Sequence, residues 1–320
     1  MTGAADIRVR VAEVEAVTPT IRRLRLVASS GEPLPEFSGG AHTVLSMSDG
    51  VRLIRNPYSL MGSPFEPASY EISVLRVPQS RGGSSFVHDQ LHVGSEIAIS
   101  PPVNLFPLDR RGRKHILLAG GIGITPFMAM TAELEREGGH FELHYGMRSR
   151  DHGAYWGDLA KRHGHRLHTY FDNEKQTIPL TRLLDGQPLG THIYVCGPGP
   201  MIDWVLEQAR LAGWPEENVH CERFSAPPTG RPFTVDLARS RRTIKVGASE
   251  SVLEAIEAAG IDARCLCRGG ACGECETRVL EADGAIQHND HVLSEADKAS
   301  GKKIMICVSR FEGARLVLDL

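Results

Sequence analysis

Four cysteines in the last sixth of the chain have the spacing of a metal centre. Cys267, Cys272 and Cys275 form the pattern C-x4-C-x2-C, and Cys307 follows 32 residues later. This is the ligand spacing of a plant-type [2Fe–2S] cluster. Three thiolates within nine residues must converge on a compact cluster, so the backbone between them has to wrap around it. The glycines of this loop permit the positive φ angles that such a wrap needs, and its amide hydrogens can donate to the cluster sulfurs.

A structural zinc site is the alternative interpretation, because four cysteines also suit Zn²⁺. Zinc sites usually pair two short C-x2-C turns, whereas here three ligands share one loop, and this difference favours iron–sulfur. Cys265 lies two residues before Cys267, but its C-x6-C spacing to the next ligand does not fit. We therefore interpret Cys265 as a packing residue.

A glycine-rich turn near the middle of the chain has the features of a phosphate-binding loop. Gly120, Gly121 and Gly123 follow the apolar run at 115–120, and Thr125 is the expected N-cap of a helix that begins at Pro126. Glycines let the backbone approach a phosphate, and a helix N-terminus favours its charge. The third glycine of G-x-G-x-x-G is absent, so a tight turn without a ligand remains the alternative.

A second loop, Cys196-Gly197-Pro198, ends a later apolar strand. In open α/β sheets ligands bind outside the carboxyl ends of the strands, so the two loops should converge. Arg148 ends an intermediate strand, where we expect a contact with ribose or adenine; the alternative is a surface arginine.

Two N-terminal segments predict a site for a phosphorylated aromatic cofactor. Arg55, Tyr58 and Ser59 place a cation, an aromatic ring and a hydroxyl along one strand. The segment 80–85 then combines glycine amides, hydroxyls and an arginine ahead of a short helix expected at 85–91, which is the chemistry of a phosphate cradle. Either segment alone would suit a plain barrel loop. Together, ahead of a nucleotide domain and an iron–sulfur domain, they predict a flavin.

The elements that must position these residues predict several domains. The first hundred residues read as short alternating strands separated by turn residues, which is typical of a small antiparallel β-barrel. From about residue 111, apolar strands alternate with helices, which predicts a parallel sheet. A Pro-rich linker precedes the last segment. The expected bounds are 1–108 for the flavin-binding barrel, 111–224 for the NAD(P)H-binding α/β domain, 225–232 for the linker and 233–320 for an α+β ferredoxin domain.

Composition excludes several classes of protein. A hydrophobic content of 41% and a charged content of 23% are typical of a globular protein. The formal charge of -3 provides no basic field for nucleic acid. No apolar run approaches the roughly 20 residues of a membrane span, and the N-terminus has no apolar signal core. We therefore expect a cytoplasmic protein without a membrane or nucleic-acid partner, in which a reducing environment disfavours disulfides.

In their order along residues 6–320, these motifs resemble the phthalate dioxygenase reductase family. The motifs are Tyr58-Ser59, 80–85, 120–126, Cys196-Gly197-Pro198, Glu222-Arg223-Phe224, the cysteine loop, Cys307-Val308-Ser309-Arg310 and the closing Leu316-Val317-Leu318-Asp319-Leu320. The stretch 265–268 and the ending look most like the reductases of carnitine monooxygenase, vanillate demethylase and phenoxybenzoate dioxygenase. The resemblance implies a flavin barrel, an NAD domain and a ferredoxin domain of the β-grasp type.

Carried over residue by residue, the resemblance implies a set of roles. Tyr58 and Ser59 would contact the isoalloxazine and ribityl groups of FMN, and Phe224 would lie against the ring. Thr125 would approach flavin and nicotinamide together, with Cys196 as the other group at the hydride-transfer site. The family motif is Arg-x-Tyr-Ser, but Asn56 stands at the arginine position here and Arg55 one residue earlier. The residues expected to hold the flavin phosphate are Arg81, Gly82, Gly83 and Ser84.

The resulting hypothesis is electron transfer from NADH through FMN and [2Fe–2S] to a separate, transiently bound Rieske-type terminal oxygenase. A flavin is needed because NADH delivers two electrons as hydride, whereas the cluster takes one at a time. A diiron or haem oxygenase is the alternative acceptor, and a redox sensor is the alternative from another class. NADPH remains the alternative coenzyme because Arg148 and Arg150 follow a strand of the nucleotide domain, although Asp151 would repel a second phosphate. The expected docking surface surrounds the cluster loop, with Arg264, Arg268 and Glu274 on its rim.

Overall fold

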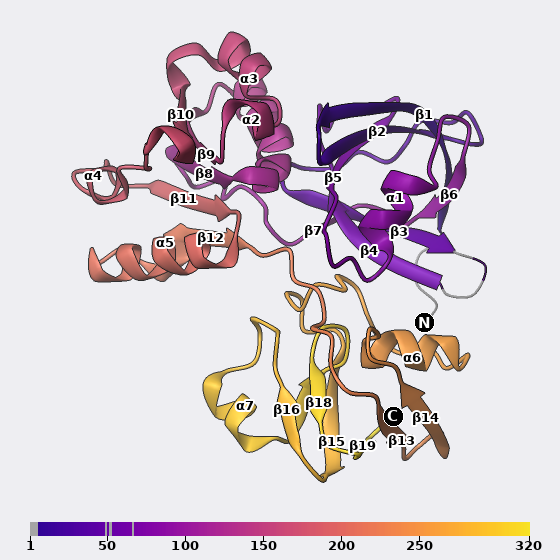
Figure 1. The fold of residues 1–320 in the computed structure, drawn as a ribbon. Helices are drawn as coiled ribbons and strands as arrows, with labels where there is room; N and C mark the ends of the chain where they lie inside the picture. Colours follow the sequence, from indigo (N-terminus) through magenta and orange to yellow (C-terminus); the bar gives the residue numbers. More distant parts are fainter. Residues whose placement is uncertain (1–5, 49, 51–52, 66) are drawn as a thin grey trace. The chain divides into compact units, whose positions relative to one another are not determined.

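The computed structural model describes residues 6–48, 50, 53–65 and 67–320 (Figure 1). Contacts divide the chain into two units. The first takes in Met1–Leu45, Tyr58–Ser80 and Ser84–Arg223, and the second Ser46–Pro57, Arg81–Gly83 and Phe224–Leu320. Two short stretches of the N-terminal region are thus grouped with the C-terminal part.

The N-terminal region forms the predicted antiparallel β-barrel, with strand order β4-β3-β6-β1-β2-β5 and with β7 paired to β3. Alternate residues of the strands, such as Val9, Val11, Leu24 and Leu26, are completely buried, which explains the period of two in the sequence. The predicted short helix is α1 (Gly83–Asp89) and begins two residues earlier than expected. The strands are β1 (Ile7–Thr18), β2 (Ile21–Ala28), β3 (Ala41–Ser48), β4 (Leu53–Ser59), β5 (Tyr70–Leu75), β6 (Glu96–Ile99) and β7 (Val103–Asn104).

The middle of the chain forms a parallel sheet with the order β10-β9-β8-β11-β12. Its strands are β8 (Lys114–Gly120), β9 (His140–Met147), β10 (Leu167–Phe171), β11 (Thr191–Cys196) and β12 (Val219–Glu222). Its helices are α2 (Thr125–Glu137), α3 (Trp156–His163), α4 (Leu180–Leu184) and α5 (Gly199–Leu211). Short 3-10 turns are η1 (Gly121–Ile124), η2 (Arg150–His152), η3 (Gly164–Arg166), η4 (Asp172–Glu174) and η5 (Glu216–Asn218).

Helices cover both faces of this sheet (Figure 1). Phe127 and Leu134 of α2 pack with Leu117 on one face. Leu180 of α4 and Ile202 of α5 pack in the cluster of the other face. The strand order reverses between β8 and β11, so the loops that follow these two strands leave the sheet at its switch point.

The C-terminal region is an α+β fold of the β-grasp type, with sheet order β14-β13-β19-β15-β17 and a separate pair of β16 and β18. The helices of this region are α6 (Val252–Ala258) and α7 (Glu295–Ser300). Ser251 caps α6 in a reciprocal capping box with Glu254, which explains why the helix begins there. The strands are β13 (Phe233–Leu237), β14 (Arg242–Val246), β15 (Glu276–Ala282), β16 (Ala285–Gln287), β17 (Lys303–Met305), β18 (Arg310–Glu312) and β19 (Arg315–Leu318).

The buried side chain of Arg310 connects the first residues of the C-terminal region to the interior of that region. This side chain is completely buried, and its guanidinium donates to the backbone carbonyls of Gly247 (3.0 Å), Glu250 and Arg231 (2.9 Å). It also lies over the ring of Phe233, 5.3 Å from the centroid. Buried polar groups require such partners, so this side chain ties the linker residue Arg231 to the loop that precedes α6.

The fold class predicted from the sequence is therefore confirmed: the chain is multidomain, with a β-barrel, a parallel α/β sheet and a β-grasp region. Among the described residues, no helix has both the length and the apolar character needed to span a bilayer.

Candidate functional site

The structure brings the sulfur atoms of the four predicted ligands together. Cys275 Sγ lies 3.2 Å from Cys307 Sγ, and the backbone N–H groups of Gly269 and Ala271 donate to Cys267 Sγ at 3.4 Å each. Hydrogen bonds from Cys272 and Cys307 lower the pKa of the Cys267 thiol. Four sulfur donors with backbone amides directed at one of them fit an iron–sulfur cluster.

The loop can approach the sulfurs because of its glycines. Gly270 has φ of 72° and Gly273 has φ of 81°. A Cβ atom on Gly270 would lie 2.7 Å from the Val308 side chain and 3.1 Å from the Asp290 backbone. Glycine at this position is therefore needed for both the left-handed conformation and the close approach.

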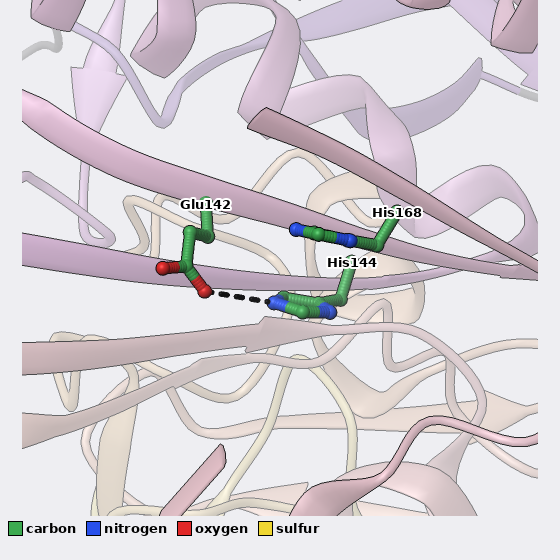
Figure 2. A group of neighbouring side chains, drawn as sticks. All are labelled: Glu142, His144 and His168. Atoms are coloured by element: carbon green, nitrogen blue, oxygen red, sulfur yellow. Dashed lines mark hydrogen bonds and ion pairs between the residues drawn. The ribbon is translucent and has the colours of Figure 1, made fainter. Parts of the chain in front are cut away.

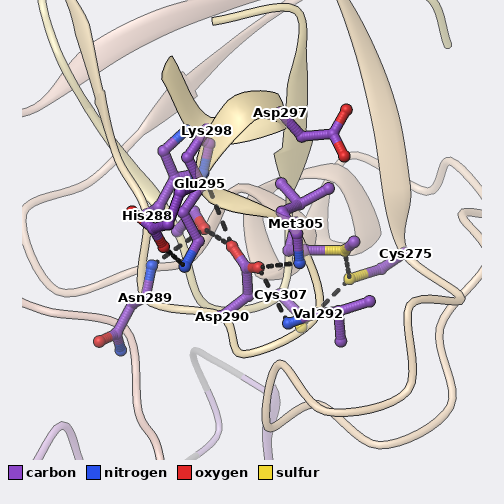
Figure 3. A network of polar contacts seen from close by, with 12 residues as sticks. Cys275, His288, Asn289, Asp290, Val292, Glu295, Asp297, Lys298, Met305 and Cys307 are labelled. Atoms are coloured by element: carbon purple, nitrogen blue, oxygen red, sulfur yellow. Dashed lines mark hydrogen bonds and ion pairs between the residues drawn. The ribbon is translucent and has the colours of Figure 1, made fainter. Parts of the chain in front are cut away.

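The buried carboxylate of Asp290 stabilises a turn that contacts the cysteine loop (Figure 3). Asp290 is 3% exposed and accepts hydrogen bonds from the amides of Leu293 (2.9 Å) and Val292 (3.3 Å). The neighbouring amide of His291 donates to the carbonyl of Gly270 at 3.1 Å. The turn at Asp290 thus holds the cluster loop by its backbone, a role that the sequence analysis missed.

The structure also bears on the predicted positions of Cys265 and Arg268, two further residues of this segment. Burial raises the pKa of the Cys265 thiol to about 12, and its side chain packs against the apolar core, as the packing interpretation expects. Arg268 was expected on an exposed docking rim, and this is wrong. Its side chain is 13% exposed and pairs with Glu257 of α6, which also holds Arg55 at 2.9 Å. One carboxylate between two guanidinium groups turns the Arg268 side chain inward.

The two glycine loops of the parallel sheet converge, as the strand order requires. Gly197 and Gly120 lie so close that a Cβ on Gly197 would be 3.1 Å from the backbone of Gly120. A Cβ on Gly120 would lie 2.6 Å from Met201 Sδ and 2.8 Å from Pro198. A Cβ on Gly123 would overlap the carbonyl of Cys196. Neither loop can carry side chains at these positions, and backbone is what each presents to a ligand.

The start of α2 differs by one residue from the prediction. Thr125 is the first helical residue rather than the N-cap, a position that Ile124 takes. The Thr125 hydroxyl donates to the carbonyl of Ile122 at 3.1 Å, because the preceding residues already turn as the 3-10 helix η1. Thr125 is 2% exposed. The predicted cap is therefore wrong, while the predicted role of Thr125 at a ligand stays a prediction.

Glu222 is a candidate that the sequence analysis quoted within a motif without assigning a role. It ends β12, pairs in register with Cys196 of β11, and its Oε2 is enclosed without a hydrogen-bond partner among the described residues. Burial raises the pKa of Glu222 to about 8 and raises that of the Cys196 thiol. Both groups are thus neutral near pH 7. An ionisable residue at the carboxyl end of the last parallel strand is the signal that could have identified it.

The residues predicted to contact the flavin on β4 and at 81–84 lie on that strand, on the turn before α1 and on the first two residues of α1. Ser59 is buried, and its hydroxyl has no partner among the described residues, which suits a ligand contact. Ser84 accepts from the amide of Val77 at 3.2 Å, and Gly82 has φ of 120°. Arg81 pairs with Glu254 and donates to the carbonyl of Ser249 at 2.8 Å. Of the other predicted contacts, Arg55 pairs with Glu257, Tyr58 lies on β4, and Gly83 lies beside Asn56. Arg148 is exposed after β9, and Phe224 is 50% exposed.

Two family models match the chain. The 2Fe-2S iron-sulfur cluster binding domain matches residues 235–312, and the N-terminal domain of dimethylamine monooxygenase subunit DmmA-like proteins matches residues 95–219. The chain is 45% identical to a carnitine monooxygenase reductase subunit of Acinetobacter baumannii, over 97% of this chain and 96% of that protein. The solved structure of phthalate dioxygenase reductase aligns with a TM-score of 0.89 and 33% identity, over 99% of this chain and 98% of that one.

The chain belongs to the phthalate dioxygenase reductase family. The predicted family is thereby confirmed, and the chain is an oxidoreductase that serves as the reductase component of an oxygenase system. Another relative, the heme-dependent oxidative N-demethylase beta subunit of Ectopseudomonas mendocina, is also 45% identical, over 98% of each chain. The matched iron–sulfur domain contains all four converging cysteines, so the predicted [2Fe–2S] cofactor is confirmed.

The first prediction separates cluster ligands from the adjacent thiol. Cys307→Ser should abolish the EPR signal of the reduced cluster and lower the iron content, because Cys307 Sγ is one of the converging sulfurs. Cys265→Ser is the matched control and should keep both. Reduction of the flavin should be unchanged in either variant. An intact cluster signal in Cys307→Ser, or its loss in Cys265→Ser, would contradict the assignment.

The second prediction concerns Glu222 and pH. Since burial raises its pKa from 4.5 to about 8, the folded chain keeps a proton that the unfolded chain releases. The free energy of unfolding should therefore fall as the pH rises from about 5 to about 8, and Glu222→Gln should remove a part of that fall on the order of 3 kcal/mol. Urea denaturation at several pH values, followed by tryptophan fluorescence, measures this, because Trp156, Trp204 and Trp214 all lie in the first unit.

Glu207→Gln provides the control for this measurement. Glu207 is exposed and pairs with Arg210, which lowers its pKa, so its titration falls below pH 5. The wild-type slope between pH 5 and 8 should persist in Glu207→Gln. The same slope in Glu222→Gln would show that Glu222 does not hold the proton.

Proposed function

We propose that the chain accepts hydride from NADH and passes single electrons through FMN and the [2Fe–2S] cluster to a Rieske-type terminal oxygenase. The observation that carries this proposal is the convergence of four cysteine sulfurs in a chain that also has two converged glycine loops at the switch point of a parallel sheet. A redox sensor would need the thiol site, but it would have no use for a hydride site. When bound, the flavin supplies the conversion of a two-electron hydride into single electrons, and the cluster carries one electron at a time.

The residues at the glycine loops have a positioning role in this proposal. The backbones of Gly120 and Gly197 would admit the pyrophosphate and nicotinamide, since no side chain occupies either position. The buried hydroxyl of Thr125 and the neutral Cys196 thiol would border the nicotinamide ring. A neutral surface at this point suits a dihydronicotinamide, whose ring is itself uncharged. We place Phe224, which is half exposed, against the flavin ring.

The turn at 80–84 is the proposed site of the FMN phosphate. The backbone amide of Gly82 lies just before α1, and Gly83 and Ser84 are the first two residues of that helix, where a dianion can be held. The Arg81 guanidinium, which pairs with Glu254, would supply the cation. The proposed functional domains are 1–108 for FMN, 111–224 for NADH and 233–320 for the cluster, with 225–232 as the linker. No strand or helix occurs in 225–232, which supports that assignment.

We propose NADH rather than NADPH as the coenzyme. Two cations follow β9, but Arg150 pairs with Glu174 at 3.1 Å and lies over the ring of Phe171. Arg148 is exposed like Arg150, and the carboxylate of Asp151 lies close to both in sequence. A 2′-phosphate would therefore find little uncompensated positive charge here.

The acceptor is the finer part of the proposal. The motif resemblance favours a Rieske-type oxygenase, and relatives named for carnitine monooxygenase and vanillate O-demethylase agree with it. A haem oxygenase is the second candidate, because the Ectopseudomonas mendocina relative is as similar as the carnitine one. The proposed docking surface around the cluster loop consists of Leu266, which is 42% exposed, with Ala271 and Glu274. Redox partners of this kind bind transiently through small areas. We place this reaction in the cytoplasm, where NADH is supplied.

The third prediction tests the coenzyme. Anaerobic reduction by NADH should bleach the flavin and cluster bands, and kcat/KM should favour NADH over NADPH at least tenfold, which is about 1.4 kcal/mol. Arg148→Ala should lower the residual activity with NADPH more than that with NADH. A tenfold preference for NADPH in the wild type would overturn the assignment.

The fourth prediction tests the acceptor. The NADH-reduced protein is mixed, in a stopped-flow instrument, with a purified Rieske-type oxygenase and separately with a haem oxygenase from the systems of its relatives. Reduction of the Rieske-type centre should be at least tenfold faster, and Glu274→Lys should change that rate mainly at low ionic strength. Faster reduction of the haem protein would instead support the second candidate. Glu295→Lys on α7 is the control for a charge change away from the loop.

A further inference from the structure

Three ligand-type side chains lie together in the parallel sheet, apart from the cysteine site (Figure 2). Glu142 and His144 are two residues apart on β9, so their side chains project from the same face. His168 of β10 is the register partner of His144. Two adjacent parallel strands therefore place one carboxylate and two imidazoles side by side.

The distances allow the three groups to share one ion. Their ligand atoms all lie within 4.8 Å of one another, and Glu142 Oε2 is 3.4 Å from His144 Nε2. The two imidazole rings are stacked, with centroids 4.6 Å apart and planes inclined by 11°. Ligands of a tetrahedral Zn²⁺ at 2.0–2.1 Å are separated by about 3.4 Å. An imidazole directs its lone pair within the plane of its ring, so the His168 ring on the edge strand β10 would have to rotate out of the stack to share an ion with His144.

The surroundings of His144 suit a metal ligand. Its side chain is 2% exposed, and Nδ1 lies 2.9 Å from the Tyr170 hydroxyl, leaving Nε2 to face Glu142. A histidine that binds a metal through one nitrogen commonly donates the N–H of the other to an oxygen acceptor, which fixes the ring.

The group of Glu142, His144 and His168 is separate from the proposed nucleotide site. The neighbouring residue Tyr145 projects from the opposite face of β9 and donates to the carbonyl of Gly121 in the first glycine loop. Glu142, His144 and His168 therefore lie on the face that does not hold that contact. The hydride-transfer chemistry proposed above does not use them.

We propose that Glu142, His144 and His168 form a binding site for a divalent transition-metal ion of the Zn²⁺ type. Two imidazoles and one carboxylate are ligands that such ions accept, whereas Mg²⁺ and Ca²⁺ prefer oxygen alone. The ion would bind the Nε2 lone pair of His144 and would tie the edge strand β10 to β9. Binding to the folded chain alone would stabilise it by RT ln(1 + [Zn²⁺]/Kd).

The ammonium group of Lys114 disfavours a bound cation, so its removal tests the proposal through an expected gain in metal affinity. This ammonium group pairs with Glu142 Oε1 at 2.8 Å, so it neutralises the carboxylate and repels a cation. The other oxygen, Oε2, faces His144. Removing the ammonium group should therefore strengthen metal binding, while removing any ligand should weaken it.

The experiment uses the full-length protein with its iron–sulfur cluster in place. Zn²⁺ is titrated anaerobically against a chromophoric chelator, and zinc and iron per chain are counted after desalting. The iron count shows that the cysteine site is filled and cannot take up the zinc. The wild type should bind one zinc, and the affinity should fall at least tenfold in His168→Gln and in Glu142→Gln. It should rise about threefold or more in Lys114→Gln.

Two controls identify the site. His165→Gln, an exposed histidine of η3, should leave zinc binding unchanged. His220→Gln reports on the other histidine group, in which His192 Nδ1 lies 3.0 Å from His220 Nε2. The proposal would be overturned if His220→Gln lost zinc binding while His168→Gln retained it. It would also be overturned if the wild type bound no zinc at 100 µM free ion. Tyr170→Phe should weaken binding about tenfold, which a role in folding alone would not do.

Discussion

The need to bring four sulfur atoms within contact of each other governs the C-terminal part of the chain. Three of these sulfurs come from nine consecutive residues, so the loop has to fold around a point instead of forming regular structure. Gly270 allows this because it packs directly on Val308 and on the turn at Asp290. The Asp290 carboxylate in turn holds that turn by accepting two backbone amides. The core contributes the fourth sulfur through Cys307, which is buried beside Met305 and Val308.

A second constraint of the same kind acts in the parallel sheet. At the switch point between β8 and β11, two loops must leave neighbouring strands in a space that side chains cannot share. The glycines at 120, 123 and 197 relieve this crowding, and in the proposed function the same loops bind the nucleotide. Packing and binding thus impose the same residue type. Glu222 and Cys196 lie beside these loops as neutral groups because burial disfavours their charged forms.

The sequence predicted the parts of the site that depend on local spacing. The cysteine ligands and the glycine loops are readable because their geometry follows from a few consecutive residues. The start of α2 was misplaced by one residue, since η1 already turns the backbone before Thr125 and makes a cap unnecessary. The inward position of Arg268 was not predictable, because its partner Glu257 is on a helix and is shared with Arg55, far away in sequence. Likewise, the contact between Glu142, His144 and His168 depends on the pairing of β9 with β10, which the residue types do not specify.

This chain is similar to reductase subunits of different oxygenase systems, and its architecture offers a physical explanation for that similarity. The residues that we propose for the cofactors lie mostly in the glycine loops, on β4, around the start of α1 and at the four cysteines, and these roles do not depend on which protein accepts the electron. The cluster delivers one electron at a time, which a Rieske-type centre and a haem can both accept. On the docking surface proposed above, the choice of acceptor would fall to the exposed side chains around the cluster, such as Leu266 and Glu274. Because those positions carry no part of the proposed hydride site, a change there would leave the electron-transfer chain intact.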